Sequence, residues 1–144
     1  MPTARNVADY FLSKTRLEVG DSITHLKLQK LVYDAQGFHL AVYDKPLFNE
    51  HIEAWDHGPV APDLYQDFVS YESDPLPAAE ESQAAAPFTS EQISLLDDGY
   101  EVFGQFSAWK LRQMTHSEPT WEKAHPSGVI THAAMEKYFK TQID

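Results

Sequence analysis

One long run of the sequence, His25 to Tyr43, constrains the fold more than any other part of the chain. Its apolar residues recur at the i, i+3, i+4 and i+7 spacing of a helix, and a second apolar row lies beside the first. The first row is Leu28, Leu31, Val32, Ala35, Phe38 or His39, and Val42; the second is Leu26, Tyr33 and Leu40. Two rows bury most of a helix's circumference. The run therefore predicts the central, most buried helix, with Thr24 or Ser22 available as its N-cap.

Shorter patterns predict further helices around this one. Helices are expected at Ala4 to Ser13 with Thr3 as N-cap, at Pro62 to about Tyr71, after Ser107, and at His132 to Lys140. The stretch from Thr89 to Gln92 has the form of a capping box, and Gly104 is a natural stop for the helix that follows it. Pro119 to Ala124 is either a loop or a short helix, and a turn is expected at Pro126 to Gly128.

The remaining segments are expected to be irregular or extended. Leu17 to Ser22 has the composition of a loop, and Leu47 to Trp55 is typical of a short hairpin or two small strands. Ser73 to Pro87 contains three prolines and no aromatic residue, which predicts a flexible connection that adds nothing to the packed core. We therefore expect residues 1–144 to form one mainly α domain, compact around its central helix, with at most a small β-hairpin element.

The most unusual short stretch is Ile52 to Tyr65, which holds a Gly-Pro turn between large side chains. Proline fixes its own φ and biases the residue before it away from helix, and glycine tolerates the backbone that results. Gly58-Pro59 therefore predicts a rigid elbow that holds Trp55 and His57. Two interpretations remain open: a structural corner between an extended segment and a helix, and a part of a recognition surface.

Charge is segregated along the chain. The formal net charge is −11, and no lysine or arginine lies between Lys45 and Lys110. This window carries thirteen of the 22 acidic residues, so that nine acidic residues stand against 11 basic ones elsewhere. Such a field repels nucleic-acid phosphates and accelerates encounter with a basic partner. A solvated acidic face that keeps the protein soluble is the alternative.

Several kinds of chemistry find no support in the sequence. There is no cysteine, which excludes disulfides and thiolate sites, and no apolar run of the length that a membrane span needs. The seven histidines include the pairs His51/His57 and His116/His125, but none has a recognised metal-ligand spacing. No cofactor-binding or phosphate-binding loop is present. We expect a cytoplasmic protein without metal or cofactor.

An enzymatic alternative is a hydrolase of a phage or mobile element that uses His57, His116 and a carboxylate. Asp56 or Glu53 would orient the imidazole of His57, with His116 as a second partner. The sequence has no G-x-S-x-G motif to supply a nucleophile. This alternative requires the three groups to converge in one pocket.

Taken together, the motifs resemble the Panacea domain of SocA-like antitoxins and phage-associated proteins. The pieces that carry the resemblance are LQKLVYDAQG, PLF, IEAWDHGPV and DLY in the first half, and Thr115-His116, Glu118-Pro119, Trp121 and Tyr138-Phe139 in the second. His57 departs from the family, in which this position is often aromatic, and the departure counts against a catalytic role for its imidazole. The structural part of the motif is Leu28, Lys30, Leu31, Tyr33, Gly58, Pro59, Val60, His116 and Trp121.

The resemblance implies a non-enzymatic antitoxin that binds a cognate toxin directly. It also implies that some members deliver the toxin to an AAA+ protease, and the motifs of this chain do not decide whether it does so. The acidic window fits a basic toxin. We expect the toxin to contact Trp55, Asp56, His57, Asp63, Tyr65, Asp67 and Glu72. An adaptor or scaffold without a toxin is the third alternative.

Overall fold

A computed structural model describes residues 1–15, 23–72 and 74–143. The expected loop at Leu17 to Ser22 lies outside these residues. The helices are α1 (Ala4–Leu12), α2 (His25–Tyr43), α3 (Pro62–Phe68), α4 (Glu81–Ala84), α5 (Ser90–Phe103), α6 (Ala108–His116), α7 (Pro119–Ala124) and α8 (His132–Lys140), with a 3-10 turn, η2 (Val69–Tyr71), after α3. The strands are β1 (Ile52–Trp55), β2 (Gly58–Val60) and β3 (Val129–Ile130). The mainly α prediction is confirmed.

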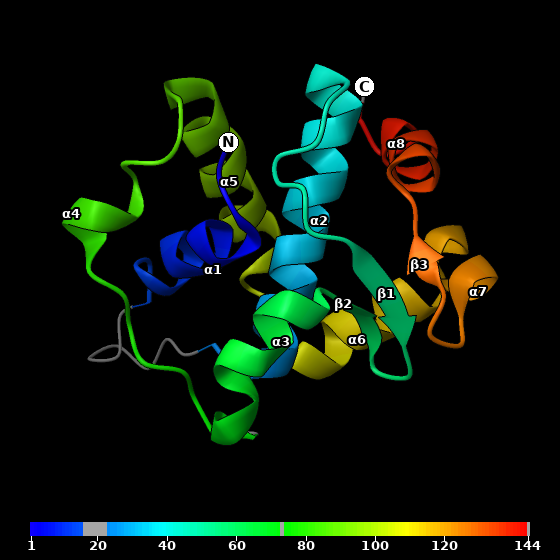
Figure 1. Ribbon diagram of the computed structural model, residues 1–144, viewed down its shortest axis with the longest axis horizontal. Helices are drawn as coiled ribbons and strands as arrows, with labels where there is room; N and C mark the ends of the chain where they lie inside the picture. Colours follow the sequence, from blue (N-terminus) through cyan, green and yellow to red (C-terminus); the bar gives the residue numbers. More distant parts are fainter. Residues whose placement is uncertain (16–22, 73, 144) are drawn as a thin grey trace.

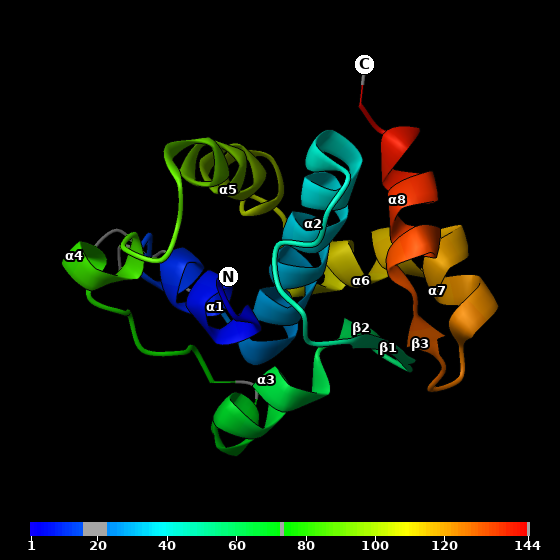
Figure 2. The same ribbon diagram turned by 45° about the horizontal axis from the view of Figure 1, so that its top comes forward.

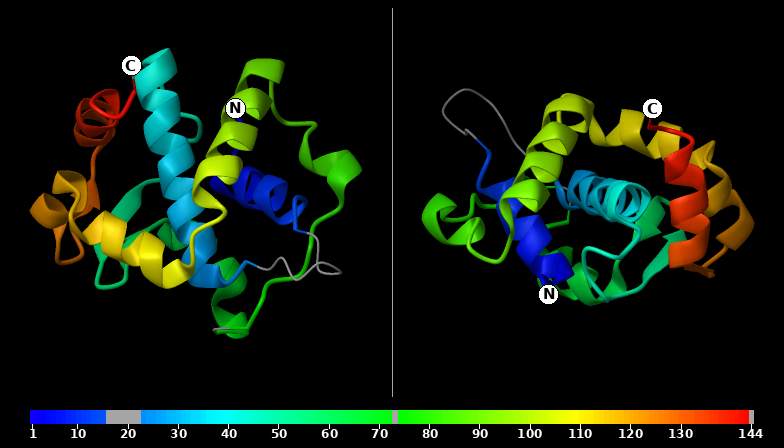
Figure 3. Two further views of the ribbon diagram at one scale, coloured as in Figure 1. Left: turned by 180° about the vertical axis from the view of Figure 1, so that it is seen from behind. Right: turned by 90° about the horizontal axis from the view of Figure 1, so that it is seen from above.

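Helix α2 is the centre of the molecule, as its two apolar rows predict. Figure 1 shows it running between α1 and α5 on one side and α8 on the other, and it also packs against α6 and β2. Leu28, Leu31, Val32 and Tyr33 are buried in the shared core. Seen from above, the other elements surround it (Figure 3). The bounds of α2 are those that the periodicity predicts.

Local capping signals place the helix starts correctly. Thr3, Thr24, Thr89, Ser107 and Thr131 each accept a hydrogen bond from a backbone N–H in the first turn of their helix. These side chains satisfy donors that otherwise lack a partner at a helix N-terminus. The predicted capping box at the start of α5 and the stop at Gly104 are both confirmed.

The β element is larger than a hairpin. Strands β1 and β2 pair antiparallel around the turn Asp56-His57, with Trp55 opposite Gly58. Strand β3 joins the other edge of β1 and gives the order β2-β1-β3. The sequence predicts only a turn at Pro126 to Gly128 in this region, because a strand of two residues has no periodicity to detect.

The segment 74–87 corrects one expectation. Leu76 and Ala84 are buried in the core cluster, and the backbone N–H of Leu76 donates to the carbonyl of Ile23 at 2.8 Å. In Figure 2 the segment runs past α1 and includes α4. The expectation that it adds nothing to the packed core is wrong, because the side chains of Leu76 and Ala84 both pack into that core. None of the described helices combines the length and the apolar character that crossing a bilayer demands.

Candidate functional site

The elbow at Gly58 is held from below by a lysine of the central helix. The Lys30 ammonium donates a hydrogen bond to the backbone carbonyl of His57 at 2.7 Å. Gly58 has φ +126°, and a Cβ at that position would lie 1.3 Å from Lys30 Nζ. A side chain would thus be strained by the backbone and would overlap the ammonium. Position 58 therefore requires glycine, because Lys30 occupies the space that a side chain there would need.

Two glutamine side chains of α2 form hydrogen bonds with backbone groups before and after the elbow, as Lys30 does at the elbow itself. The Gln29 side chain accepts a hydrogen bond from the backbone N–H of Ala61 at 3.0 Å, where α3 begins. Gln36 accepts from the N–H of Leu47 at 2.7 Å and donates to the carbonyl of Phe48 at 2.8 Å. Buried backbone groups need such partners. Three polar side chains of the LQKLVYDAQG motif, Gln29, Lys30 and Gln36, therefore hold the chain between Leu47 and Ala61 against the central helix.

A buried ionisable cluster lies beneath this layer. The Tyr33 hydroxyl donates to Glu118 at 2.6 Å and lies 2.6 Å from the hydroxyl of Thr120. Burial lowers the pKa of Lys30 to about 7, against the opposing effects of Asp34 and Glu118. Burial raises the pKa of Glu118 to about 7, and it raises the pKa of Asp34 well above its usual value. The cluster joins α2 to the start of α7.

The outer side of the elbow is a layer of imidazole and indole rings. His125 Nε2 lies 2.8 Å from the carboxylate of Asp56, and this hydrogen bond lowers the pKa of Asp56. His116 Nε2 lies 2.8 Å from the backbone carbonyl of Asp56, and the Trp121 indole N–H donates to the carbonyl of Trp55 at 2.8 Å. The Trp121 ring lies 4.2 Å from that of His116 and 4.4 Å from that of His125. These contacts fasten α6 and α7 to the turn.

The hydrolase alternative gains no support from this geometry. His116 uses Nε2 on a backbone carbonyl, and burial lowers its pKa. The side chain of His57 is exposed and makes no hydrogen bond to another described residue. Within residues 1–15, 23–72 and 74–143, no group of three or more His, Asp or Glu side chains is placed to hold a metal ion.

The residues expected to contact a partner belong to β1, the turn after it, α3 and η2 with the following residue, a stretch that we call the elbow face (Figure 1). Five of them are exposed: Asp56, His57, Asp63, Asp67 and Glu72. Trp55 and Tyr65 are half-buried, with ring centroids 4.9 Å apart, and Tyr65 lies equally close to the ring of His25 on α2. Asp67 forms an ion pair with Arg5 at 3.2 Å. Trp55 and Tyr65 are thus in contact with each other, and the role of all seven residues in binding stays a prediction.

The residues of the structural motif divide into two groups. Leu28, Lys30, Leu31, Tyr33, Gly58, Pro59 and Val60 are buried, whereas His116 and Trp121 are half-buried against the turn. Sequence reasoning missed Gln29, Gln36 and Asp34, all buried on α2. The sequence could have identified these three residues, because polar residues on a helix with two apolar rows are largely buried and must find hydrogen-bond partners in the core.

The fold and this site define a mainly helical domain in which polar side chains of one buried helix hold a surface turn. Residues 28–122 match the family model described as "Antitoxin SocA-like, Panacea domain". The match covers more than half of the chain and includes the elbow and its partners on α2, α6 and α7. The chain belongs to this family.

One curated relative is the protein named "Antitoxin SocA" of Caulobacter vibrioides (strain NA1000 / CB15N). The two are 44% identical over 66 residues, which is 45% of this chain and 34% of the relative. The aligned region thus spans about a third of the length of that relative. Among solved structures, none matches the chain significantly.

Proposed function

We propose that this chain is an antitoxin that neutralises a protein toxin by binding it directly, as a non-enzymatic protein of the cytoplasm. The observation that carries the proposal is the family match over residues 28–122. The similarity to the relative named Antitoxin SocA supports the same role. Neutralisation then consists of covering or misaligning the active surface of the toxin.

The elbow face is the first surface that we propose for the toxin. Trp55 and Tyr65 offer large, partly buried rings, and Trp and Tyr are among the residues that dominate binding energy at interfaces. The carboxylates of Asp56, Asp63 and Glu72 are exposed beside them. A basic toxin would meet complementary charge there, which accelerates association more than it adds affinity.

Co-expression tests the proposal. The protein encoded by the adjacent gene is produced in a bacterial host with and without this chain, and growth is measured. Rescue of growth together with co-purification of the two proteins is expected. Equal toxicity in the presence and absence of the chain would refute the antitoxin role.

Charge reversal tests the elbow face. The variant Asp63→Lys/Asp67→Lys is compared with Glu101→Lys/Glu122→Lys, which makes the same change in net charge at exposed positions on α5 and α7. Association with the toxin at low salt should slow about tenfold or more for the first pair, and the difference between the pairs should shrink at high salt. Stopped-flow kinetics measures both. Equal rates for the two variants would remove the elbow face from the proposal.

Delivery of the toxin to an AAA+ protease is a separable part of the proposal. If the chain is an adaptor, the toxin should be degraded faster in cells that contain the chain than in cells that lack it. A pulse-chase experiment reports the half-life. A long-lived toxin held in an inactive complex would leave occlusion as the mechanism.

A further inference from the structure

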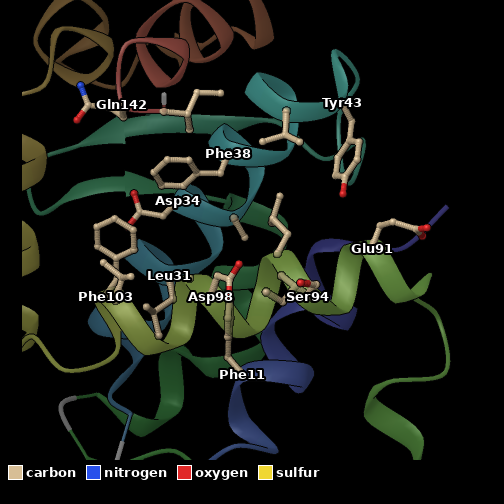
Figure 4. Close-up of a pocket in the computed structure, with 17 residues that line it drawn as sticks. Phe11, Leu31, Asp34, Phe38, Tyr43, Glu91, Ser94, Asp98, Phe103 and Gln142 are labelled. Carbon is tan, nitrogen blue, oxygen red and sulfur yellow. The ribbon is translucent and has the colours of Figure 1, made fainter.

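A groove runs between α2 and α5, apart from the elbow face. Its volume is about 610 Å³, within the range of ligand-binding sites. Leu31, Phe38 and Val42 line it from α2, and Leu95, Val102 and Phe103 line it from α5 (Figure 4). In Figures 1 and 2, α5 and α3 lie on opposite sides of α1, so the groove and the elbow face are different surfaces.

The groove is unusual because it is apolar yet contains a buried carboxylate. Asp34 lines it, is only 9% exposed, and makes no hydrogen bond to another described residue. Figure 4 shows its side chain beside Phe38 and Phe103, whose rings are stacked with centroids 5.8 Å apart. The nearest cation on its own helix, Lys30, is hydrogen-bonded to the carbonyl of His57. Burial disfavours the charged form of this carboxyl in spite of the attraction of Lys30, and a cation brought by a ligand would stabilise that charged form.

The α5 wall adds further negative charge and open space. Glu91 and Asp98 both line the groove, and none of its lining residues is a lysine, arginine or histidine. A Cβ placed on Gly99 would meet no atom within 4 Å. Val42 and Val102 are 48% and 49% exposed, and Tyr43 and Ile143, which also line the groove, are exposed as well. The groove thus combines apolar side chains on both walls with the carboxyl groups of Asp34, Glu91 and Asp98. This combination complements an amphipathic segment that carries a cation.

We propose that the α2/α5 groove binds an amphipathic helix of the toxin, with apolar residues at i, i+3 or i+4 and i+7 and one lysine or arginine that pairs with Asp34. This inference rests on the proposed antitoxin function and names a second contact surface for it. Helix-in-groove recognition uses this spacing of anchors. A second copy of this chain is a poor occupant, because it would bring a net charge of −11 to an acidic groove.

The experiment compares groove variants in the complex with the adjacent-gene protein. Val102→Arg and Val42→Arg each place a cation on a groove wall, and Asp34→Asn replaces the carboxyl, which a bound cation would ionise, by a neutral amide of nearly the same shape. Val129→Arg is the matched control, because Val129 is 52% exposed, lies outside the groove and faces Glu53 across the sheet. Affinity is measured by titration calorimetry, and circular dichroism checks that each variant is folded.

The two arginine variants and Asp34→Asn should each weaken binding about thirtyfold or more, while Val129→Arg binds as the wild type does. Wild-type affinity in all three groove variants would overturn the inference and leave the antitoxin function standing. A wild-type chain that neither binds nor neutralises the adjacent-gene protein would overturn both.

Photo-crosslinking identifies the occupant. A benzoylphenylalanine at position 102 should capture a toxin peptide with apolar residues at helical spacing around a lysine or arginine, whereas the same group at position 129 should not. Capture of a second copy of this chain, or of no peptide in a complex that has formed, would refute the proposal.

Discussion

Replacement of Gly58 by alanine tests the arrangement that holds the elbow. At φ +126° a residue with a Cβ is strained by about 1–3 kcal/mol. The added Cβ would also lie 1.3 Å from Lys30 Nζ and 2.7 Å from its Cε, so the ammonium must leave the His57 carbonyl. Burial lowers the pKa of Lys30 to about 7, so the side chain is charged below that pH, where loss of a hydrogen bond from a charged group costs about 1.5–3 kcal/mol. The expected loss is therefore about 2.5–6 kcal/mol, a large part of the stability of an ordinary domain.

Urea denaturation followed by circular dichroism measures this loss. With a slope of about 2 kcal/mol per M, the midpoint should fall by roughly 2 M in Gly58→Ala. Gly99→Ala is the control, because its Cβ would meet no atom within 4 Å inside α5; that variant should gain about 0.5–1 kcal/mol.

A second substitution separates strain from displacement of the lysine. Leucine at position 30 ends at Cδ, and the Lys30 Cδ lies 3.6 Å from the Cβ that alanine would add, an ordinary contact. In a Lys30→Leu background, Gly58→Ala should therefore cost only the backbone strain, and the double-mutant cycle should show a coupling of about 1.5–3 kcal/mol. A Gly58→Ala protein within about 0.5 kcal/mol of the wild type, or a zero coupling, would refute this account.

Two further variants test the buried layers. Burial raises the pKa of Glu118 from 4.5 to about 7, so the folded state favours the protonated carboxyl. The stability that this group contributes is fully present below pH 4.5 and is lost as the pH rises through 7. The free energy of unfolding of Glu118→Gln, relative to that of the wild type, should therefore rise by on the order of 3 kcal/mol between pH 4.5 and pH 7.5. Urea titrations at the two pH values measure it, and a difference that does not change with pH would contradict this account. Gly37→Ala places a Cβ 2.2 Å from the Phe139 ring and should cost about 1–3 kcal/mol, part of which Phe139→Leu should restore; no loss would show that α8 can shift freely.

Most of the helices were predictable from sequence because they are specified by neighbours along the chain, whereas α4 lies in the segment that was expected to be irregular. Two apolar rows define α2, and a threonine or serine caps the first turn of α1, α2, α5, α6 and α8. Periodicity and capping act over a few residues, so no tertiary information is needed to read them. The Gly-Pro elbow was predictable for the same reason.

The parts that were missed depend on residues far apart in the sequence. Strand β3 exists because Ile130 pairs with Ile52, and Leu76 is buried because the fold brings its backbone to Ile23. No local pattern encodes either contact. A contact of this kind becomes favourable only when the whole core assembles around α2.

The sequence by itself determined the central helix, the elbow and the segregation of negative charge. Only the tertiary structure decided what those features do: Lys30 lies under Gly58, and Asp34 opens on the α2/α5 groove. Both residues stand on the same helix, one turn apart. The pattern of α2 places both on a mostly buried helix, but what each of them contacts depends on what the rest of the chain places opposite, and that is fixed only by packing.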